Sequence, residues 1–131
     1  MTQDSLFLRD KDRQKLLDLL DQYIPSVEAW AYGSRVNGEA HDASDLDLVL
    51  RSADLSPIPI EQLVDFLDAL RESTIPIIVE ARDWARLPTS FHQQIMKKYS
   101  VLKDFANPLY ASYFSRLAVK LKASVLLWKF P

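Results

Sequence analysis

The most informative stretch of this sequence is GSRVNGEAHDASDLDL, which spans residues 33–48. It contains both glycines of the chain, Gly33 and Gly38, separated by only four residues. An average protein of this length carries several times more glycine, spread over many turns. Because glycine lets a backbone approach a neighbouring group closely, we expect a tight, functional loop here.

Two aspartates follow this loop at alternate positions. The segment 45–51 reads DLDLVLR, which predicts a strand. Side chains two residues apart on a strand share one face, so Asp45 and Asp47 lie together. The opposite face is apolar and buried, with Leu46, Leu48 and Leu50. Paired carboxylates on a half-buried strand need compensating charge. A hard divalent cation, Mg²⁺ or Mn²⁺, supplies it.

The start of the loop has the chemistry of a phosphate site. Gly33 and Ser34 follow a predicted strand and open a turn that offers backbone N–H groups and a hydroxyl. Gly38 allows the loop to fold tightly over a phosphate, and Arg35 adds a charge-assisted contact. We therefore expect Gly33, Ser34, Arg35 and Gly38 to bind an anion. With the metal site, this describes a nucleoside triphosphate and its cation.

Hydrophobic periodicity and breaker residues place the remaining elements. They predict an α/β (α+β) domain, in which a small mixed sheet is flanked by helices. The predicted helices cover 10–23, 60–70 and a segment beginning at 88, with one helical turn at 34–38; the predicted strands cover 26–32, 45–51 and 75–81.

Composition narrows the class of protein. The chain has 131 residues, 48% of them hydrophobic, which fits one folded domain. It has no cysteine, so disulfides, thiol catalysis and cysteine-bound metals are excluded. A net charge of −2 argues against general nucleic-acid binding. We find no leader or membrane-spanning pattern, and expect a cytoplasmic protein.

The C-terminal segment differs in composition. Residues 107–131 contain four basic residues and no acidic one, with apolar residues at steps of three and four. We divide the chain into a domain at 1–106 and a basic amphipathic helical tail at 107–131. The tail has three interpretations: a last helix packed on its own domain, a docking helix for a partner, or an extension without fixed structure.

The motif resembles a known family. Gly33-Ser34, ten intervening residues, and then Asp45-x-Asp47 resemble the signature of the DNA polymerase beta-like nucleotidyltransferases. The surrounding AYGSR and SDLDL are similar to the minimal nucleotidyltransferase (MNT) family, the antitoxin half of HEPN–MNT toxin–antitoxin pairs. The resemblance covers about residues 10–104 and implies a polymerase beta-like core.

The resemblance also implies a third carboxylate on a later strand. Glu80 occupies that stretch, where the family usually has aspartate, and Asp83 is a weaker alternative. The implied mechanism is metal-dependent, with Asp45 and Asp47 holding two Mg²⁺ (or Mn²⁺) ions. Glu80 then completes one metal site and helps to deprotonate the acceptor.

The implied function is protein adenylylation. AMP passes from ATP to a hydroxyl, expected to be a tyrosine's, of a partner HEPN ribonuclease toxin, with which the chain forms a complex. The small size supports an acceptor presented by another macromolecule. Two alternatives remain: a catalytically weak antitoxin that neutralises its partner by binding, and a small-molecule nucleotidyltransferase of the aminoglycoside-modifying type.

Overall fold

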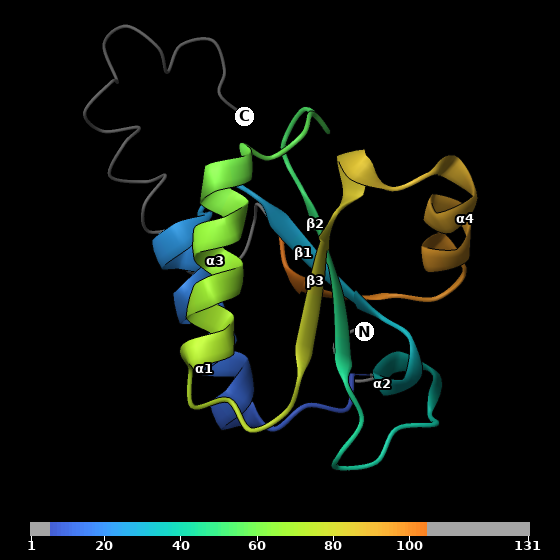
Figure 1. The fold of residues 1–131 in the computed structure, drawn as a ribbon. Coiled ribbons are helices and arrows are strands. Elements are labelled where there is room, and N and C mark those ends of the chain that lie inside the picture. The colour runs from blue at the N-terminus through green and yellow to red at the C-terminus, as the bar shows by residue number, and fades with distance from the viewer. Residues whose placement is uncertain (1–5, 105–131) are drawn as a thin grey trace, which may run out of the picture.

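The computed structural model describes residues 6–104, which form four helical and four strand elements joined by short loops and a 3₁₀ turn (Figure 1). The elements are, in order, α1 (Asp10–Tyr23), β1 (Glu28–Tyr32), α2 (Ser34–Asn37), β2 (Leu46–Arg51), α3 (Ile60–Glu72), β3 (Val79–Asp83), the 3₁₀ helix η2 (Trp84–Arg86), α4 (Thr89–Lys97) and β4 (Ser100–Lys103).

The four strands form one mixed sheet in the order β3-β2-β1-β4. β1 pairs antiparallel with both β2 and β4, whereas β2 and β3 are parallel. A parallel pair needs a crossover connection, and α3 provides it. The expected α/β class with a small mixed sheet is confirmed.

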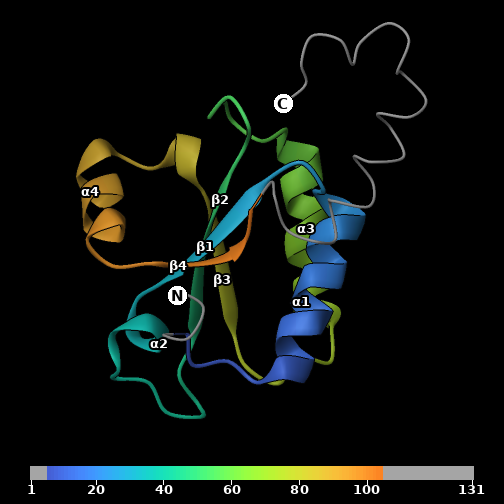
Figure 2. The same ribbon diagram turned by 180° about the vertical axis from the view of Figure 1, so that it is seen from behind.

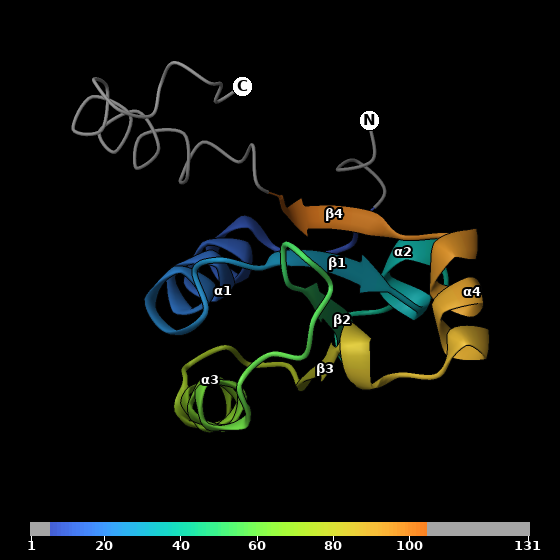
Figure 3. The same cartoon turned by 90° about the horizontal axis from the view of Figure 1, so that it is seen from above.

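Helices α1 and α3 cover one face of the sheet (Figure 3). The apolar stripe of α1 contributes Leu16 and Leu20, and α3 contributes Phe66. They pack on Leu48 and Leu50, which are fully buried. Burying these side chains stabilises the fold by about 1.5–3 kcal/mol each.

Helix α4 lies on the opposite face (Figure 2). It contributes Ile95 to a second cluster around Trp30, Val49 and Trp84. The ring of Trp30 stacks on Tyr99 with 4.0 Å between centroids. Because α4 has only nine residues, it covers part of this face: Val49 is buried there, whereas Asp47 is half-buried and Glu80 is exposed.

The third strand differs from its prediction. The structure places β3 at Val79–Asp83 and leaves residues 75–78 outside the strand, although the carbonyl of Ile78 accepts from the N–H of Leu46 at 2.9 Å. Pro76 has no N–H and restricts the residue before it, so this segment enters the sheet late. Asp83, which we expected to lie past the strand, is its last residue.

The sequence pattern also gave no sign of β4 or of η2. The helix predicted to begin at 88 ends at Lys97, and Tyr99 lies between α4 and β4. The predicted tail at 107–131 and the boundary at 106 lie outside the described residues. None of the helices within residues 6–104 is both long and apolar enough to cross a membrane.

A buried lysine makes stability depend on pH. Lys103 has 0% exposure, and its Nζ donates to the carbonyl of Pro25 at 2.9 Å. Burial lowers its pKa to about 8, an effect partly offset by the charge of Asp21. In the unfolded chain the lysine keeps its ordinary value of 10.5. Between these values the unfolded chain binds more protons, so stability rises with pH.

We therefore expect the free energy of unfolding to gain about 3 kcal/mol from this group between pH 8 and 10.5. Below pH 8 the cost of the buried charge is fully present. Urea unfolding of the wild type and of Lys103→Met over this range measures the effect. The difference between the two curves should change with pH, and parallel curves would contradict the prediction.

Candidate active site

Three side chains from neighbouring strands lie side by side on the face opposite α1 and α3. The register pairs Tyr32 of β1 with Asp47 of β2, and Asp47 with Glu80 of β3. Leu46 and Leu48 point into the core, so strand alternation turns Asp47 to the other face. Glu80 is therefore placed directly beside Asp47.

Asp45 lies one step before β2 and is exposed. Alternation places it on the same side as Asp47, and its charge contributes to raising the pKa of that residue. The sequence pattern thus brings Asp45, Asp47 and Glu80 to one open region of the sheet. Within residues 6–104, however, no three acidic or histidine side chains converge closely enough to hold a metal ion.

The electrostatics of Asp47 show a shortage of positive charge. Burial raises its pKa most, and repulsion from Glu80 raises it further. Arg82 opposes the shift, and Asp45 adds to it. A cation placed among these carboxylates would relieve the repulsion, and hard oxygen donors match the preference of Mg²⁺. The donor set therefore fits the expected metal, although its side chains are not gathered around one point.

Glycine is required at position 33 for two reasons, its backbone conformation and its close approach to Asp47. Its φ is +82°, a region that side-chain-bearing residues rarely adopt. A Cβ added there would lie 2.6 Å from Oδ2 of Asp47. Only a residue without a side chain allows the turn to rest against this carboxylate, so the glycine couples the turn to the acidic cluster.

Ser34 begins α2 directly after this glycine. No side chain caps the first turn of α2, and within the described part of the chain the hydroxyl of Ser34 has no hydrogen-bond partner. Gly38 ends α2 in the left-handed region with φ +86°, and no described atom lies within 4 Å of a Cβ built on it. Backbone geometry explains Gly38, and its contact with a phosphate stays a prediction.

The structure does not place Arg35 where we expected it. The side chain is only 4% exposed, and its nitrogens are occupied by backbone carbonyls from two segments. The guanidinium donates to the carbonyls of Ser44 at 2.7 Å, Asp42 at 3.0 Å and Phe7 at 2.7 Å. These bonds hold the loop before Asp45 against the N-terminal segment, so Arg35 positions the loop instead of facing a phosphate.

Arg35→Lys is expected to lower the free energy of unfolding by about 2 kcal/mol. The single ammonium group of lysine cannot donate to all of the carbonyls that surround the planar guanidinium, so buried hydrogen bonds are lost. Chemical denaturation measures this loss. Arg71→Lys, at an exposed ion pair with Asp68 on α3, serves as a matched control and should change stability by less than about 0.5 kcal/mol. Equal losses in the two variants would contradict the positioning role.

Asp83 is not a third acid of this cluster. It is buried, and its carboxylate accepts from the backbone N–H groups of Ile58 at 2.9 Å and Ala85 at 3.1 Å. It also pairs with Arg86. These contacts fix the loop before α3 and the start of η2, which gives Asp83 a structural role.

Sequence reasoning missed Arg82. Both of its terminal nitrogens lie 3.5 Å from Oε1 of Glu80, and Nη1 lies 3.4 Å from the hydroxyl of Tyr32. Its place two residues after Glu80 was a usable signal, because alternation puts both side chains on one face. No motif marked it.

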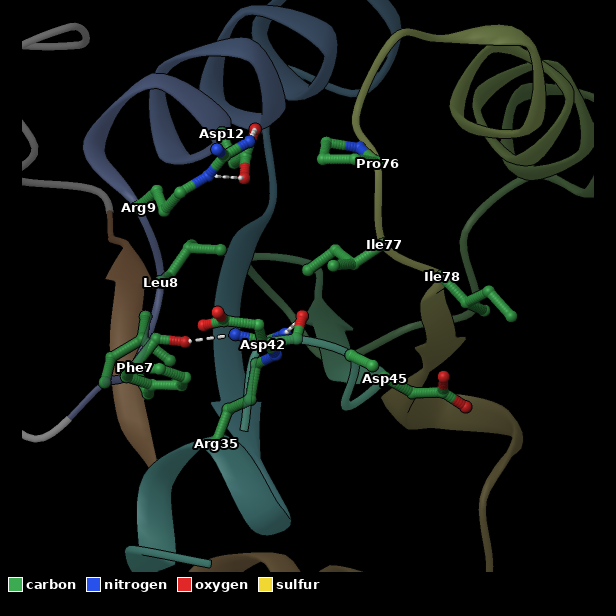
Figure 4. Close-up of a pocket in the computed structure, with 12 residues that line it drawn as sticks. Phe7, Leu8, Arg9, Asp12, Arg35, Asp42, Asp45, Pro76, Ile77 and Ile78 are labelled. Atoms are coloured by element: carbon green, nitrogen blue, oxygen red, sulfur yellow. Dashed lines mark hydrogen bonds and ion pairs between the residues drawn. The ribbon is translucent and has the colours of Figure 1, made fainter. Parts of the chain in front are cut away.

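A pocket adjoins the cluster at Asp45 and has a cavity volume of about 840 Å³. Figure 4 shows Phe7 and Leu8 of the N-terminal segment on one side and Ile77 and Ile78 on the other. The walls are mainly apolar, with Asp42 and Asp45 at the loop. Of the three acids of the cluster only Asp45 lines this pocket, and Figure 4 shows its carboxylate directed away from Phe7 and Leu8.

Comparison with known proteins identifies the family. Residues 14–105 match the family described as "Polymerase beta, Nucleotidyltransferase". The chain is 37% identical over 92 residues to the probable protein adenylyltransferase MntA of Haemophilus influenzae, covering 66% of this chain and 74% of the relative.

Two solved structures share the fold. A toxin–antitoxin crystal structure with AMP-PNP has a TM-score of 0.58 at 22% identity, covering 85% of this chain and 93% of that one. The complex of tri-AMPylated Shewanella oneidensis HEPN toxin with its MNT antitoxin has a TM-score of 0.56 at 19% identity, covering 88% and 94%. Because the family match spans most of the chain and agrees with the MntA relative, this chain belongs to the polymerase beta nucleotidyltransferase family, among its minimal nucleotidyltransferases.

Proposed function

We propose that this chain is an antitoxin that transfers AMP from ATP to a hydroxyl group of a partner HEPN toxin. The observation that carries the proposal is the pairing of Asp47 with Glu80 beside the turn at Gly33. The MntA relative is named a probable protein adenylyltransferase. A structure of the same fold holds an AMPylated HEPN toxin with its antitoxin.

In this proposal Asp45 and Asp47 bind Mg²⁺, and Glu80 completes the ligand set. The bound cation would neutralise the charge of the phosphates and that of the carboxylates around it. The backbone at Gly33 and the hydroxyl of Ser34 bind the outgoing phosphates. Each of these residues is anchored to the sheet or to its first turn, which fixes their relative positions.

The acceptor hydroxyl approaches from the open part of the sheet that α4 leaves uncovered. Its oxygen forms a bond to the α-phosphorus of ATP, while the bond from that phosphorus to pyrophosphate breaks. The proton of the hydroxyl passes to a carboxylate, a role that we assign to Glu80, whose side chain is exposed. An acceptor carried on a folded partner fits such an open site. We place this reaction in the cytoplasm.

One observation favours a second candidate, neutralisation by binding alone. Within residues 6–104 the three acidic side chains share a face but do not converge on a point. Glu80, in addition, is paired with Arg82. A chain that kept the fold while losing transfer would still present the same surface to its partner.

The intact mass of the partner toxin distinguishes the two candidates. The toxin is incubated with this protein, ATP and Mg²⁺, and in parallel without ATP. Added adenylate is expected only in the complete mixture. A stable complex with no change in mass, alongside an active adenylyltransferase control, would reject transfer and favour binding.

A further inference from the structure

Arg82 brings a positive charge into the acidic cluster before any ligand arrives. We propose that Arg82 acts as an internal counter-ion, which holds Glu80 in the nucleotide-free protein and is displaced from it when the metal–nucleotide complex binds. The inference rests on the proposed metal site and adds a positioning residue to it. It explains why Glu80 lies beside Asp47 without joining a metal-binding arrangement.

The contacts of Arg82 define its present position. Nη1 and Nη2 both lie 3.5 Å from one oxygen of Glu80. The same Nη1 lies 3.4 Å from the hydroxyl of Tyr32, which faces Asp47 across the sheet. The guanidinium carbon is 6.0 Å from the ring centroid of Phe91 on α4. Arg82 therefore bridges β3, β1 and α4 next to the carboxylates.

These contacts are weak enough to exchange. Distances of 3.4–3.5 Å are at the long limit for hydrogen bonds. The side chains of Arg82 and Glu80 are 41% and 45% exposed, and an ion pair so accessible to water contributes little to stability. A divalent cation, with twice the charge, competes effectively for the same carboxylate.

The other arginines near this face make hydrogen bonds or ion pairs with groups outside the acidic cluster. Arg35 serves backbone carbonyls. Arg51 pairs with Glu28 at 2.6 Å and lies over the ring of Trp30. Arg86 pairs with Asp83. Arg82 alone of these four contacts a carboxylate of the cluster, and once released it can face the phosphates of the nucleotide.

The inference predicts effects of opposite sign on two ligands. In the free protein, Arg82 opposes binding of a metal ion, by repulsion and by holding Glu80. With the nucleotide present, its charge favours the triphosphate. A purely structural arginine would affect both ligands in the same direction, through loss of folded protein.

The test uses Mn²⁺ alone as the first probe. Free Mn²⁺ is followed by electron paramagnetic resonance during titration of the nucleotide-free protein. Arg82→Gln is expected to tighten Mn²⁺ binding about three- to tenfold, and to weaken binding of Mg²⁺–ATP by a similar factor. Arg82→Lys keeps the charge and should stay within about twofold for Mn²⁺. Arg71→Gln, an exposed arginine on α3, should match the wild type.

The outcomes separate this inference from the proposed function. If the wild type binds Mn²⁺ through Asp47 and Arg82→Gln leaves that affinity unchanged or weaker, the inference is overturned and the metal site stands. If Asp47→Asn binds Mn²⁺ as tightly as the wild type does, both the metal site and the inference are contradicted. Tighter Mn²⁺ binding together with weaker nucleotide binding supports the inference.

Discussion

Asp47→Asn is expected to lower the rate of AMP transfer by at least about 10³-fold. Asp47 lies at the centre of the cluster, between Glu80 and Tyr32 in the register. Asparagine keeps the size of the side chain but removes one negative charge and one anionic oxygen. The measurement is the initial rate of adenylate incorporation into the partner toxin.

The same variant should fold at least as well as the wild type. Burial and the neighbouring Glu80 raise the pKa of Asp47 above its ordinary value. A raised pKa means that the charged carboxylate costs stability in the folded state, and this cost is fully present once the pH exceeds the raised value. A neutral asparagine removes the cost, so the melting temperature should stay equal or rise.

The expected loss of transfer and the expected retention of stability together separate a catalytic effect from unfolding. Loss of transfer with an unchanged or raised melting temperature places the effect in the chemistry. Transfer that continues at more than a tenth of the wild-type rate would contradict the role of Asp47. If Asp47→Asn still neutralises the toxin in cells without transfer, binding by itself is sufficient.

The features predicted from the sequence are those set by local pattern. The stripe of Leu16 and Leu20 predicted α1, and the alternation of Asp47 with the leucines of β2 predicted both a strand and its buried face. Glu80 was chosen through the resemblance to the family, and the structure pairs it with Asp47, although the bounds of its strand were shifted. The repeat of apolar residues, about every two positions in a strand or every 3.6 in a helix, identifies the buried face even when the bounds of the element are wrong, because it depends only on relative position.

The features missed depend on contacts between distant segments. Arg35 lies in the motif, but its four carbonyl partners come from residues 7 and 41–44. Nothing local distinguishes an arginine that faces a phosphate from one buried under a loop. β4 is four residues long and is defined by pairing with β1. Its pattern is too short to be read from the sequence alone.

Gly33→Ala is expected to lower transfer by at least about 10²-fold, because a new Cβ would displace the carboxylate of Asp47. The added atom would lie 2.6 Å from Oδ2, closer than atoms can approach without movement. The end of the Asp47 side chain can rotate away, so the protein should still fold. A shift of about 1 Å in a reacting or ligand-binding group is enough for such a loss.

Gly38→Ala supplies a control with a positive φ but no described contact: φ is +82° at Gly33 and +86° at Gly38, whereas ψ is −154° at Gly33 and 4° at Gly38. Alanine at Gly38, in the left-handed region, costs about 1 kcal/mol of stability through backbone strain, and alanine at Gly33, in a region almost exclusive to glycine, costs about 1–3 kcal/mol. No described atom lies within 4 Å of the Cβ at Gly38, so this variant should lose stability while losing less of its transfer rate than Gly33→Ala. Measuring both quantities for both variants separates strain from displacement of Asp47. Equal losses of transfer would show that the conformation of the loop, and not the contact with Asp47, is what the glycines protect.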